Sequence, residues 1–242
     1  MADRPPLPIV LVRVLVVLAV EAGLLAWGLG GLPALAASPR ALTLLAVWGA
    51  GGITLGLTRP ARGQDVARAE PDPLAMLALA LLPLAIPGVA AWGGRIGRWR
   101  LPAPELTGWL GVTLSALGLW IRISAMRQLG TRFSPLLALQ REHALERTGW
   151  YAFVRHPGYL GTLLASWGAA VAFGSALALP LAGALTLIQV DRVRREERLL
   201  AGHFGDAWSD YARGTGALLP RLVRRPVAPA AREKQPPRVQ RP

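Results

Sequence analysis

The sequence predicts an all-α fold, namely a polytopic membrane helix bundle of about six transmembrane helices that ends in a C-terminal helical hairpin. Composition is the first reason. Of the 242 residues, 52% are hydrophobic and only 17% are charged, which is too little polar surface for a water-soluble chain of this length. The second reason is that the apolar residues gather in runs close to the roughly 20 residues that a helix needs to cross a bilayer.

Four such runs precede the hairpin. They extend from Ile9 to Leu29, from Ala41 to Leu57, from Leu74 to Trp92 and from Leu106 to Met126. The first run contains Arg13 and Glu21 and no convincing cleavage site follows it, so we interpret it as a retained span and not as a signal peptide. Glu21 is expected to pair with a neighbouring helix or to be protonated, and the alternative is that it belongs to a site.

The hairpin is predicted from the uncharged run at positions 158–190, which is too long for one span and short for two. Gly174 and Ser175 lie at its middle and Pro180 follows, which indicates a tight turn between two helices. The second helix should continue past the membrane to His203. The alternative is a single tilted helix, which the Gly-Ser and Pro signals disfavour.

Basic residues predict the orientation. The chain carries 27 Lys and Arg residues against 14 Asp and Glu residues, and the basic ones separate or follow apolar runs. With six spans, the more arginine-rich side also holds both termini, which predicts a cytoplasmic C-terminus and contact with lipid headgroups, and no nucleic-acid binding. The Arg- and Ala-rich usage is typical of a GC-rich bacterial gene, so the inner (cytoplasmic) membrane of a bacterium is the expected location.

Metal and thiol chemistry are not expected. The chain has no cysteine, which excludes a disulfide, a thiolate metal site and a cysteine nucleophile. Polar motifs instead flank the hairpin. Because Pro157 pushes His156 away from helical geometry, a helix should begin just after it, with free amide groups beside the Arg155 guanidinium. A helix start of this kind holds carboxylates well.

A second group of polar residues lies on the extension of the last hairpin helix. Arg192 and Glu196 share one helix face, and Glu197 lies about 100° round. A carboxylate there could hold an amine or a ribose hydroxyl. The alternative interpretation is a positively charged cytoplasmic loop followed by a salt-bridged helix end without a ligand.

Several motifs follow one another along the second half of the chain. In order they are Leu129-Gly130 with Phe133-Ser134, His143 with Leu145, Thr148-Gly149 with Tyr151, Arg155-His156-Pro157 with Tyr159 and Gly161, Arg192 with Glu196-Glu197 and Leu200, and Phe204-Gly205 with Trp208 and Tyr211. This order resembles the isoprenylcysteine carboxyl methyltransferase family, whose relatives include the phospholipid methyltransferases. The resemblance covers roughly residues 106–220, whereas the first three spans carry no motif.

The resemblance implies a membrane methyltransferase that uses S-adenosylmethionine, held in a cytoplasmic cofactor pocket. The residues implied to line this pocket are His143, Leu145, Tyr151, Arg155, His156, Pro157, Tyr159, Gly161 and Glu196. Arg192 and Glu197 are implied to be catalytic and to face the reacting groups. The resemblance also divides the chain into N-terminal transmembrane helices at 1–105, a methyltransferase core at 106–222 and a basic tail at 223–242. The composition of this tail predicts disorder.

The methyl acceptor is expected to be a lipophilic or small molecule that arrives from the bilayer. An arginine near the reaction centre favours a carboxylate. A phospholipid amine, for which Glu197 would be the base, and a small thiol remain alternatives. Among other classes of protein, a transporter is disfavoured because the charges gather at the cytoplasmic edge and not at the midplane. A binding or scaffold protein that keeps the fold without activity remains open.

Overall fold

The computed structural model describes residues 6–57, 66–70, 72–130, 137–140 and 145–221. Eight α-helices, one short 3-10 helix and two strands lie within them. In chain order they are α1 (Leu7–Leu29), α2 (Leu32–Ala36), α3 (Pro39–Gly56), β1 (Val66–Glu70), α4 (Pro73–Ile96), α5 (Pro104–Leu129), β2 (Leu137–Gln140), the 3-10 helix η3 (Gly149–Ala152), α6 (Pro157–Val171), α7 (Leu179–Phe204) and α8 (Asp206–Gly214).

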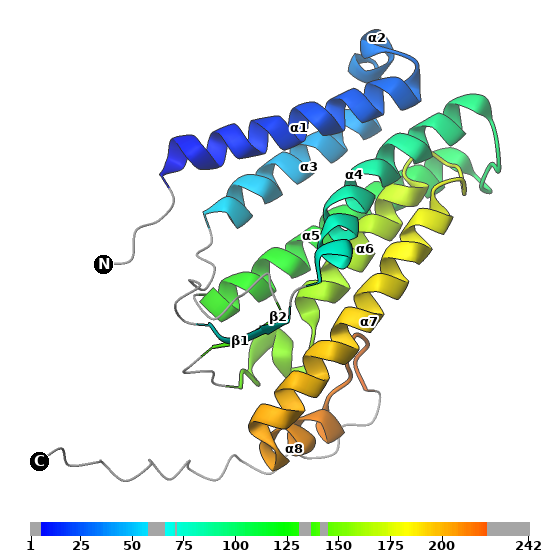
Figure 1. Ribbon diagram of the computed structural model, residues 1–242. Coiled ribbons are helices and arrows are strands. Elements are labelled where there is room, and N and C mark those ends of the chain that lie inside the picture. The colour runs from blue at the N-terminus through cyan, green and yellow to red at the C-terminus, as the bar shows by residue number, and fades with distance from the viewer. Residues whose placement is uncertain (1–5, 58–65, 71, 131–136, 141–144, 222–242) are drawn as a thin grey trace, which may run out of the picture.

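The long helices α1, α3, α4, α5, α6 and α7 run side by side as a bundle (Figure 1) and coincide with the predicted spans. Helix α4 packs against α1, α6 and α7, while α5 packs against α3 and α6. Three of the described helices, α1, α4 and α5, are long and apolar enough to cross a membrane by themselves. On α1, side chains such as Val12 and Leu15 are exposed, as expected for a surface that faces lipid. The predicted membrane helix bundle is confirmed.

Local signals fix where several helices begin. Ser38 caps α3, with its Oγ accepting a hydrogen bond from the Ala41 amide at 3.4 Å. Asp72 caps α4 in the same way, through a 3.1 Å hydrogen bond from the Ala75 amide. Proline stands in the first turn of each of these helices, where its missing N–H costs nothing.

The predicted hairpin is present. Helix α6 ends at Val171 and α7 begins at Leu179, so the turn includes the Gly-Ser pair. Gly174 has a φ of +68°, a conformation that favours glycine. The buried Ser175 hydroxyl donates to the Arg98 carbonyl at 2.8 Å, which ties the turn to the segment between α4 and α5.

Glycine pairs bring α5 and α6 into close contact. A Cβ atom built at Gly118 would lie 2.5 Å from the Gly161 carbonyl oxygen, and one at Gly161 would lie 2.5 Å from the Gly118 carbonyl oxygen. The pair Gly111 and Gly168 repeats this contact two turns away. Small residues at such positions let two backbones approach, which stabilises helix association in a bilayer.

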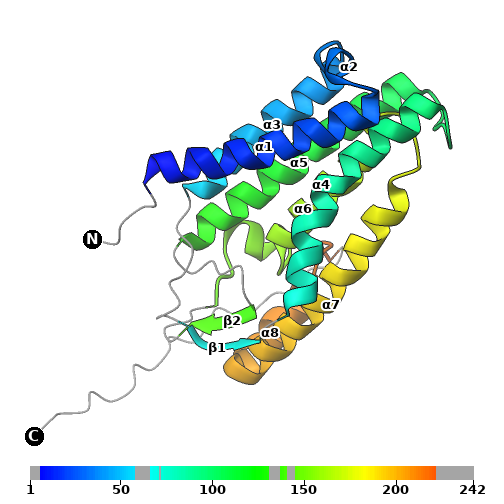
Figure 2. The ribbon, with the colours of Figure 1, turned by 45° about the horizontal axis from the view of Figure 1, so that its top comes forward.

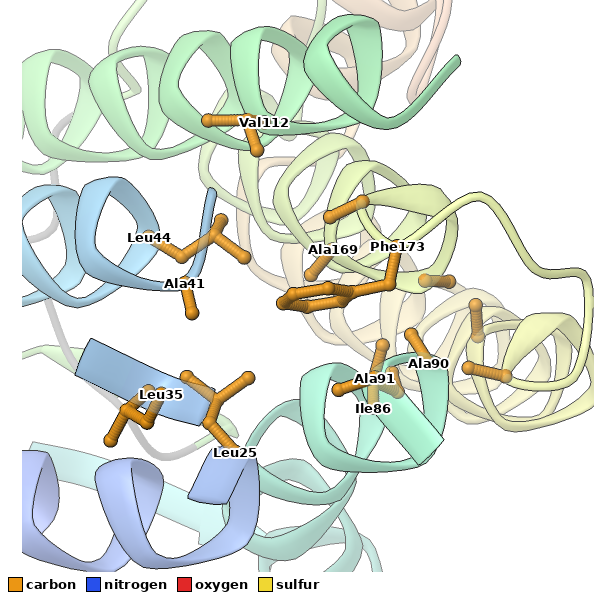
Figure 3. Close-up of a cluster of buried hydrophobic side chains, with 14 of the residues drawn as sticks. Leu25, Leu35, Ala41, Leu44, Ile86, Ala90, Ala91, Val112, Ala169 and Phe173 are labelled. Carbon is orange, nitrogen blue, oxygen red and sulfur yellow. The ribbon is translucent and has the colours of Figure 1, made fainter. Parts of the chain in front are cut away.

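The apolar core lies between the helices and toward the end of the bundle that holds the hairpin turn. Figure 3 shows Leu25 of α1, Ile86 of α4 and Phe173 near the end of α6 in this cluster, with several alanines between them. Leu185 of α7 is fully buried in it as well. The cluster therefore joins the first three long helices, which carry no motif, to the hairpin.

The two strands and α2 are additions to the predicted architecture. Strands β1 and β2 pair antiparallel, and β2 contacts α7 (Figure 2). Their backbone groups satisfy one another, as those of segments outside a helix must. No apolar periodicity in either loop predicted the pairing.

Candidate active site

The site lies where α6 begins and α7 leaves the bundle. Pro157 starts α6, and His156 is its N-cap residue. The amide of Arg155 donates to the Gly216 carbonyl at 2.8 Å, and that of His156 donates to the Ala217 carbonyl at 3.0 Å. The segment after α8 therefore holds this part of the chain in place.

Arg155 ties three elements together. Its Nε donates to Glu197 Oε1 at 2.8 Å, and its Nη2 lies 2.7 Å from the same oxygen. Nη1 donates to the carbonyl oxygens of Ala212 and Thr215. The guanidinium also lies 5.8 Å from the ring centroid of Trp208, within the range of a cation–π contact. Arg155 thus connects the start of α6 with α7 and α8.

His156 lies between two carboxylates of α7. Its Nε2 is 3.3 Å from Glu197 Oε1, and its Nδ1 is 3.9 Å from Glu196 Oε1. Burial of the Glu197 carboxyl disfavours its charge, yet the hydrogen bonds and charges of His156 and Arg155 outweigh burial and hold the pKa of Glu197 below its ordinary value. Glu197 is therefore a weak proton acceptor.

Arg192, Tyr159 and Glu196 form a hydrogen-bonded chain. Arg192 Nε donates to the Tyr159 hydroxyl at 2.9 Å, and this hydroxyl donates to Glu196 Oε2 at 2.8 Å. Arg192 is buried, with 4% of its surface exposed, although it carries a charge. Its Nη1 lies 3.4 Å from the Met76 sulfur of α4. A guanidinium and a carboxylate are thereby held on either side of one phenol.

Six of the predicted site residues come together here. They are Arg155, His156, Tyr159, Arg192, Glu196 and Glu197. Pro157 is buried at the start of α6, where it sets the geometry of His156. His143 lies outside the described residues. For the side chains that meet, the assigned roles stay predictions.

The remaining predicted residues make contacts with other groups. Leu145 packs beside Trp208 and Tyr211. The Tyr151 carbonyl accepts a 2.6 Å hydrogen bond from the Tyr211 hydroxyl, so this residue supports α8. Gly161 faces α5 in the glycine contact described above, and its nearest neighbours there are backbone atoms of α5.

Sequence reasoning missed two residues near the site. Arg122 of α5 donates to the Gly158 carbonyl at 3.2 Å and to the Thr162 hydroxyl at 2.7 Å, within the first turns of α6. The sequence could have indicated Arg122, because a charged residue inside a membrane span is costly and usually has a functional or structural role. Met76 carried no such signal, since a methionine in a span is ordinary. Among the described residues no cluster of metal-ligating side chains occurs.

The fold and the site together define an integral membrane protein with a polar centre at the end of its helix bundle. Residues 106–207 match the family model described as phospholipid methyltransferase. The resemblance inferred from the motifs, to the isoprenylcysteine carboxyl methyltransferase and phospholipid methyltransferase families, is therefore confirmed over that segment.

Curated relatives and a solved structure agree with this match. The chain is 34% identical over 107 residues to the protein-S-isoprenylcysteine O-methyltransferase of Schizosaccharomyces pombe, covering 43% of this chain and 45% of that protein. It is 32% identical over 121 residues to the Saccharomyces cerevisiae protein of the same name, covering 49% and 51%. The chain thus spans about half the length of these relatives.

The structure of a eukaryotic intramembrane Ras methyltransferase, an isoprenylcysteine carboxyl methyltransferase, superposes with a TM-score of 0.50 at 20% identity. The alignment covers 74% of this chain and 67% of that one. At this identity the similarity concerns the fold, and it extends beyond the segment that the family model matches.

Proposed function

We propose that this protein is an S-adenosylmethionine-dependent methyltransferase that acts on a carboxylate of a lipophilic substrate at the cytoplasmic face of a bacterial inner membrane. The observation that carries the proposal is the chain Arg192–Tyr159–Glu196, because it holds a buried guanidinium next to a carboxylate. An anionic acceptor and a cationic methyl donor need such a pair of groups. The names of the curated relatives support the same reaction class.

The residues at the start of α6 fit the donor. Glu196 has one oxygen bound by Tyr159 and presents the other toward His156, where it can receive an ammonium group or a ribose hydroxyl. The first amides of α6 suit a carboxylate. When bound, S-adenosylmethionine supplies a methyl group activated by its sulfonium: the bond to the acceptor oxygen forms as the carbon–sulfur bond breaks, and the bonding electron pair stays on sulfur.

Arg192 is proposed to orient the acceptor carboxylate with its planar guanidinium. A carboxylate is ionised at neutral pH and needs no base. A reaction that needs no base agrees with the surroundings of Glu197. Its pKa is lowered, and one of its oxygens is bound by Arg155 and His156. We therefore propose that Glu197 positions Arg155 and His156. An amine acceptor, which the match to a phospholipid methyltransferase model keeps as the second candidate, would have to lose a proton to some other group.

Methyl transfer by the purified, detergent-solubilised protein tests this function. With a labelled methyl donor, N-acetyl-S-farnesylcysteine should become a base-labile methyl ester, whereas phosphatidylethanolamine should remain unlabelled. Label in phosphatidylethanolamine alone would favour the amine reaction. Label in neither, by a protein that binds the donor, would support the scaffold interpretation.

Glu196→Ala should weaken binding of S-adenosylmethionine by about tenfold or more, because it removes a charge-assisted contact. Isothermal titration calorimetry measures this affinity. Glu105→Ala is the matched control, since Glu105 is an exposed glutamate that pairs with Arg40 elsewhere in the molecule. If Glu196→Ala and Glu105→Ala bound the methyl donor with equal affinity, Glu196 would not contact the donor.

A further inference from the structure

Gln189 lies on the buried face of α7 between the apolar core and the polar site. The buried residues of this face include Leu185, Gln189, Arg192 and Val193, which recur at helical spacing. Leu185 belongs to the core cluster, whereas Arg192 belongs to the site. Gln189 is therefore one helical turn deeper in the bundle than Arg192, on the side away from Glu196.

Within the part of the chain that the structure describes, the side-chain carbonyl of Gln189 has no hydrogen-bond donor. Only 1% of the residue is exposed, and among the described residues no group donates to its Oε1 atom. A buried acceptor without a donor is destabilising, and an apolar residue of the same size would pack there at no such cost. The amide is thus explained more simply by a ligand than by folding.

We propose that Gln189 is a specificity-determining residue that accepts a hydrogen bond from an N–H or O–H group of the lipophilic acceptor while Arg192 holds the acceptor's carboxylate. The inference rests on the proposed function. Side chains three residues apart on a helix have Cβ atoms about 5–6 Å apart, so one molecule can reach both if its donor lies a bond or two from the carboxylate. An N-acylated amino acid with a lipophilic side chain has this arrangement.

Two observations favour the methyl acceptor over the methyl donor as the partner of Gln189. The groups that suit the donor, Glu196 and the start of α6, lie on the other side of Arg192 along α7. Met76 of α4 contacts the Arg192 guanidinium at 3.4 Å, which places an apolar side chain from a neighbouring span beside the same group. A lipophilic molecule that enters from the bilayer fits these surroundings.

The test compares two acids that differ only in the amide. N-Acetyl-S-farnesylcysteine carries the carboxylate and the N–H, and S-farnesyl-3-mercaptopropionate carries the same carboxylate and thioether without it. Isothermal titration calorimetry should show the wild-type protein binding the first about tenfold more tightly. Gln189→Met, which keeps the length of the side chain and removes its oxygen, should bind both acids equally and should bind S-adenosylmethionine as the wild type does.

Each other outcome counts against the inference. Equal binding of the two acids by the wild type, or a preference that survives in Gln189→Met, would show that Gln189 does not accept a hydrogen bond from the N–H group of the acceptor. A loss of S-adenosylmethionine affinity in Gln189→Met would assign the residue to the cofactor. Methyl transfer is measured separately from binding. If the protein prefers the acid with the amide, and this preference depends on Gln189, but no methyl group is transferred, the proposed function is wrong and the binding role of Gln189 stands.

Discussion

Arg192 is the residue on which the proposed acceptor site depends. It is buried, and its Nε and Nη1 atoms point to different elements, the first to Tyr159 of α6 and the second to Met76 of α4. A guanidinium carries N–H groups that point in several directions, and its planar shape matches that of a carboxylate. A lysine would keep the charge but concentrate it at one atom.

Arg192→Lys should therefore lower kcat for the carboxylate acceptor by 10-fold to 100-fold, an order-of-magnitude expectation for losing a bidentate contact. The affinity for S-adenosylmethionine should change little. Single-turnover kinetics and donor titration on the same preparation measure the two quantities. Full turnover in the variant, or loss of donor binding together with turnover, would show that the acceptor does not lie at Arg192.

Glu197 makes the stability of the site dependent on pH. Its pKa in the folded protein is below the ordinary value of 4.5, so its contribution to the free energy of unfolding is complete above about pH 4.5 and is lost as the pH falls through the lowered pKa. Between about pH 5 and pH 3 the Tm of the wild-type protein in detergent should fall further than that of Glu197→Gln. The comparison cancels the titration of the other carboxylates. Parallel loss of Tm in the two proteins would mean that the ion pair with Arg155 adds no stability.

At the scale of elements, the contact between α5 and α6 sets where the site residues of α6 stand. Arg122 on α5 bonds to the Gly158 carbonyl and the Thr162 hydroxyl of α6, and Tyr159 lies between these two residues. The glycine pairs allow this distance, because any side chain there would separate the helices. A structural role for Gly161 explains its place better than contact with a cofactor.

Gly161→Ala should lower the Tm, with a cost on the order of 1–3 kcal/mol for overpacking. The new Cβ would lie 2.5 Å from the Gly118 carbonyl oxygen and 2.6 Å from the Arg122 amide nitrogen, and neither backbone atom can turn aside. Gly183→Ala is the control, because nothing lies within 4 Å of its Cβ position on α7. An unchanged Tm with weakened donor binding would return Gly161 to the cofactor pocket.

At the scale of the whole molecule, the site and the hairpin turn lie at opposite ends of the bundle. The turn contacts the segment between α4 and α5, whereas α8 and the starts of α4 and α6 surround the other end (Figure 1). Asp72 at the start of α4 forms a 3.3 Å ion pair with Arg195 of α7 there. A membrane between the two ends would separate them into different compartments.

Labelling of single cysteines tests this orientation, and the absence of native cysteine makes it simple. A thiol at the exposed Arg98 position should react with an impermeant maleimide from outside intact cells, and one at the exposed Ser209 position only after the cells are opened. Ser175 is unsuitable for this purpose because it is fully buried. If both thiols reacted from one side, the hairpin would not cross the membrane.

The sequence by itself determined the membrane helix bundle, the hairpin and most of the polar site. Hydropathy fixes long helices because the bilayer allows few other structures, and Gly174 and Pro180 interrupt the last run where the chain turns. The motif order placed Arg155, His156 and Glu196 in one site before any contact was known.

Only the tertiary structure decided which partners these residues have. The pairing of Glu197 with Arg155 and the contact of Met76 with Arg192 each join groups from different elements. Only the packed structure shows that the Gln189 carbonyl has no donor among the described residues. The spacing of residues along one helix states which of them share a face, but it does not state which neighbouring helix lies opposite. That choice depends on how the helices pack around one another, and this packing places Gly161 against α5 and Gln189 on the buried face of α7.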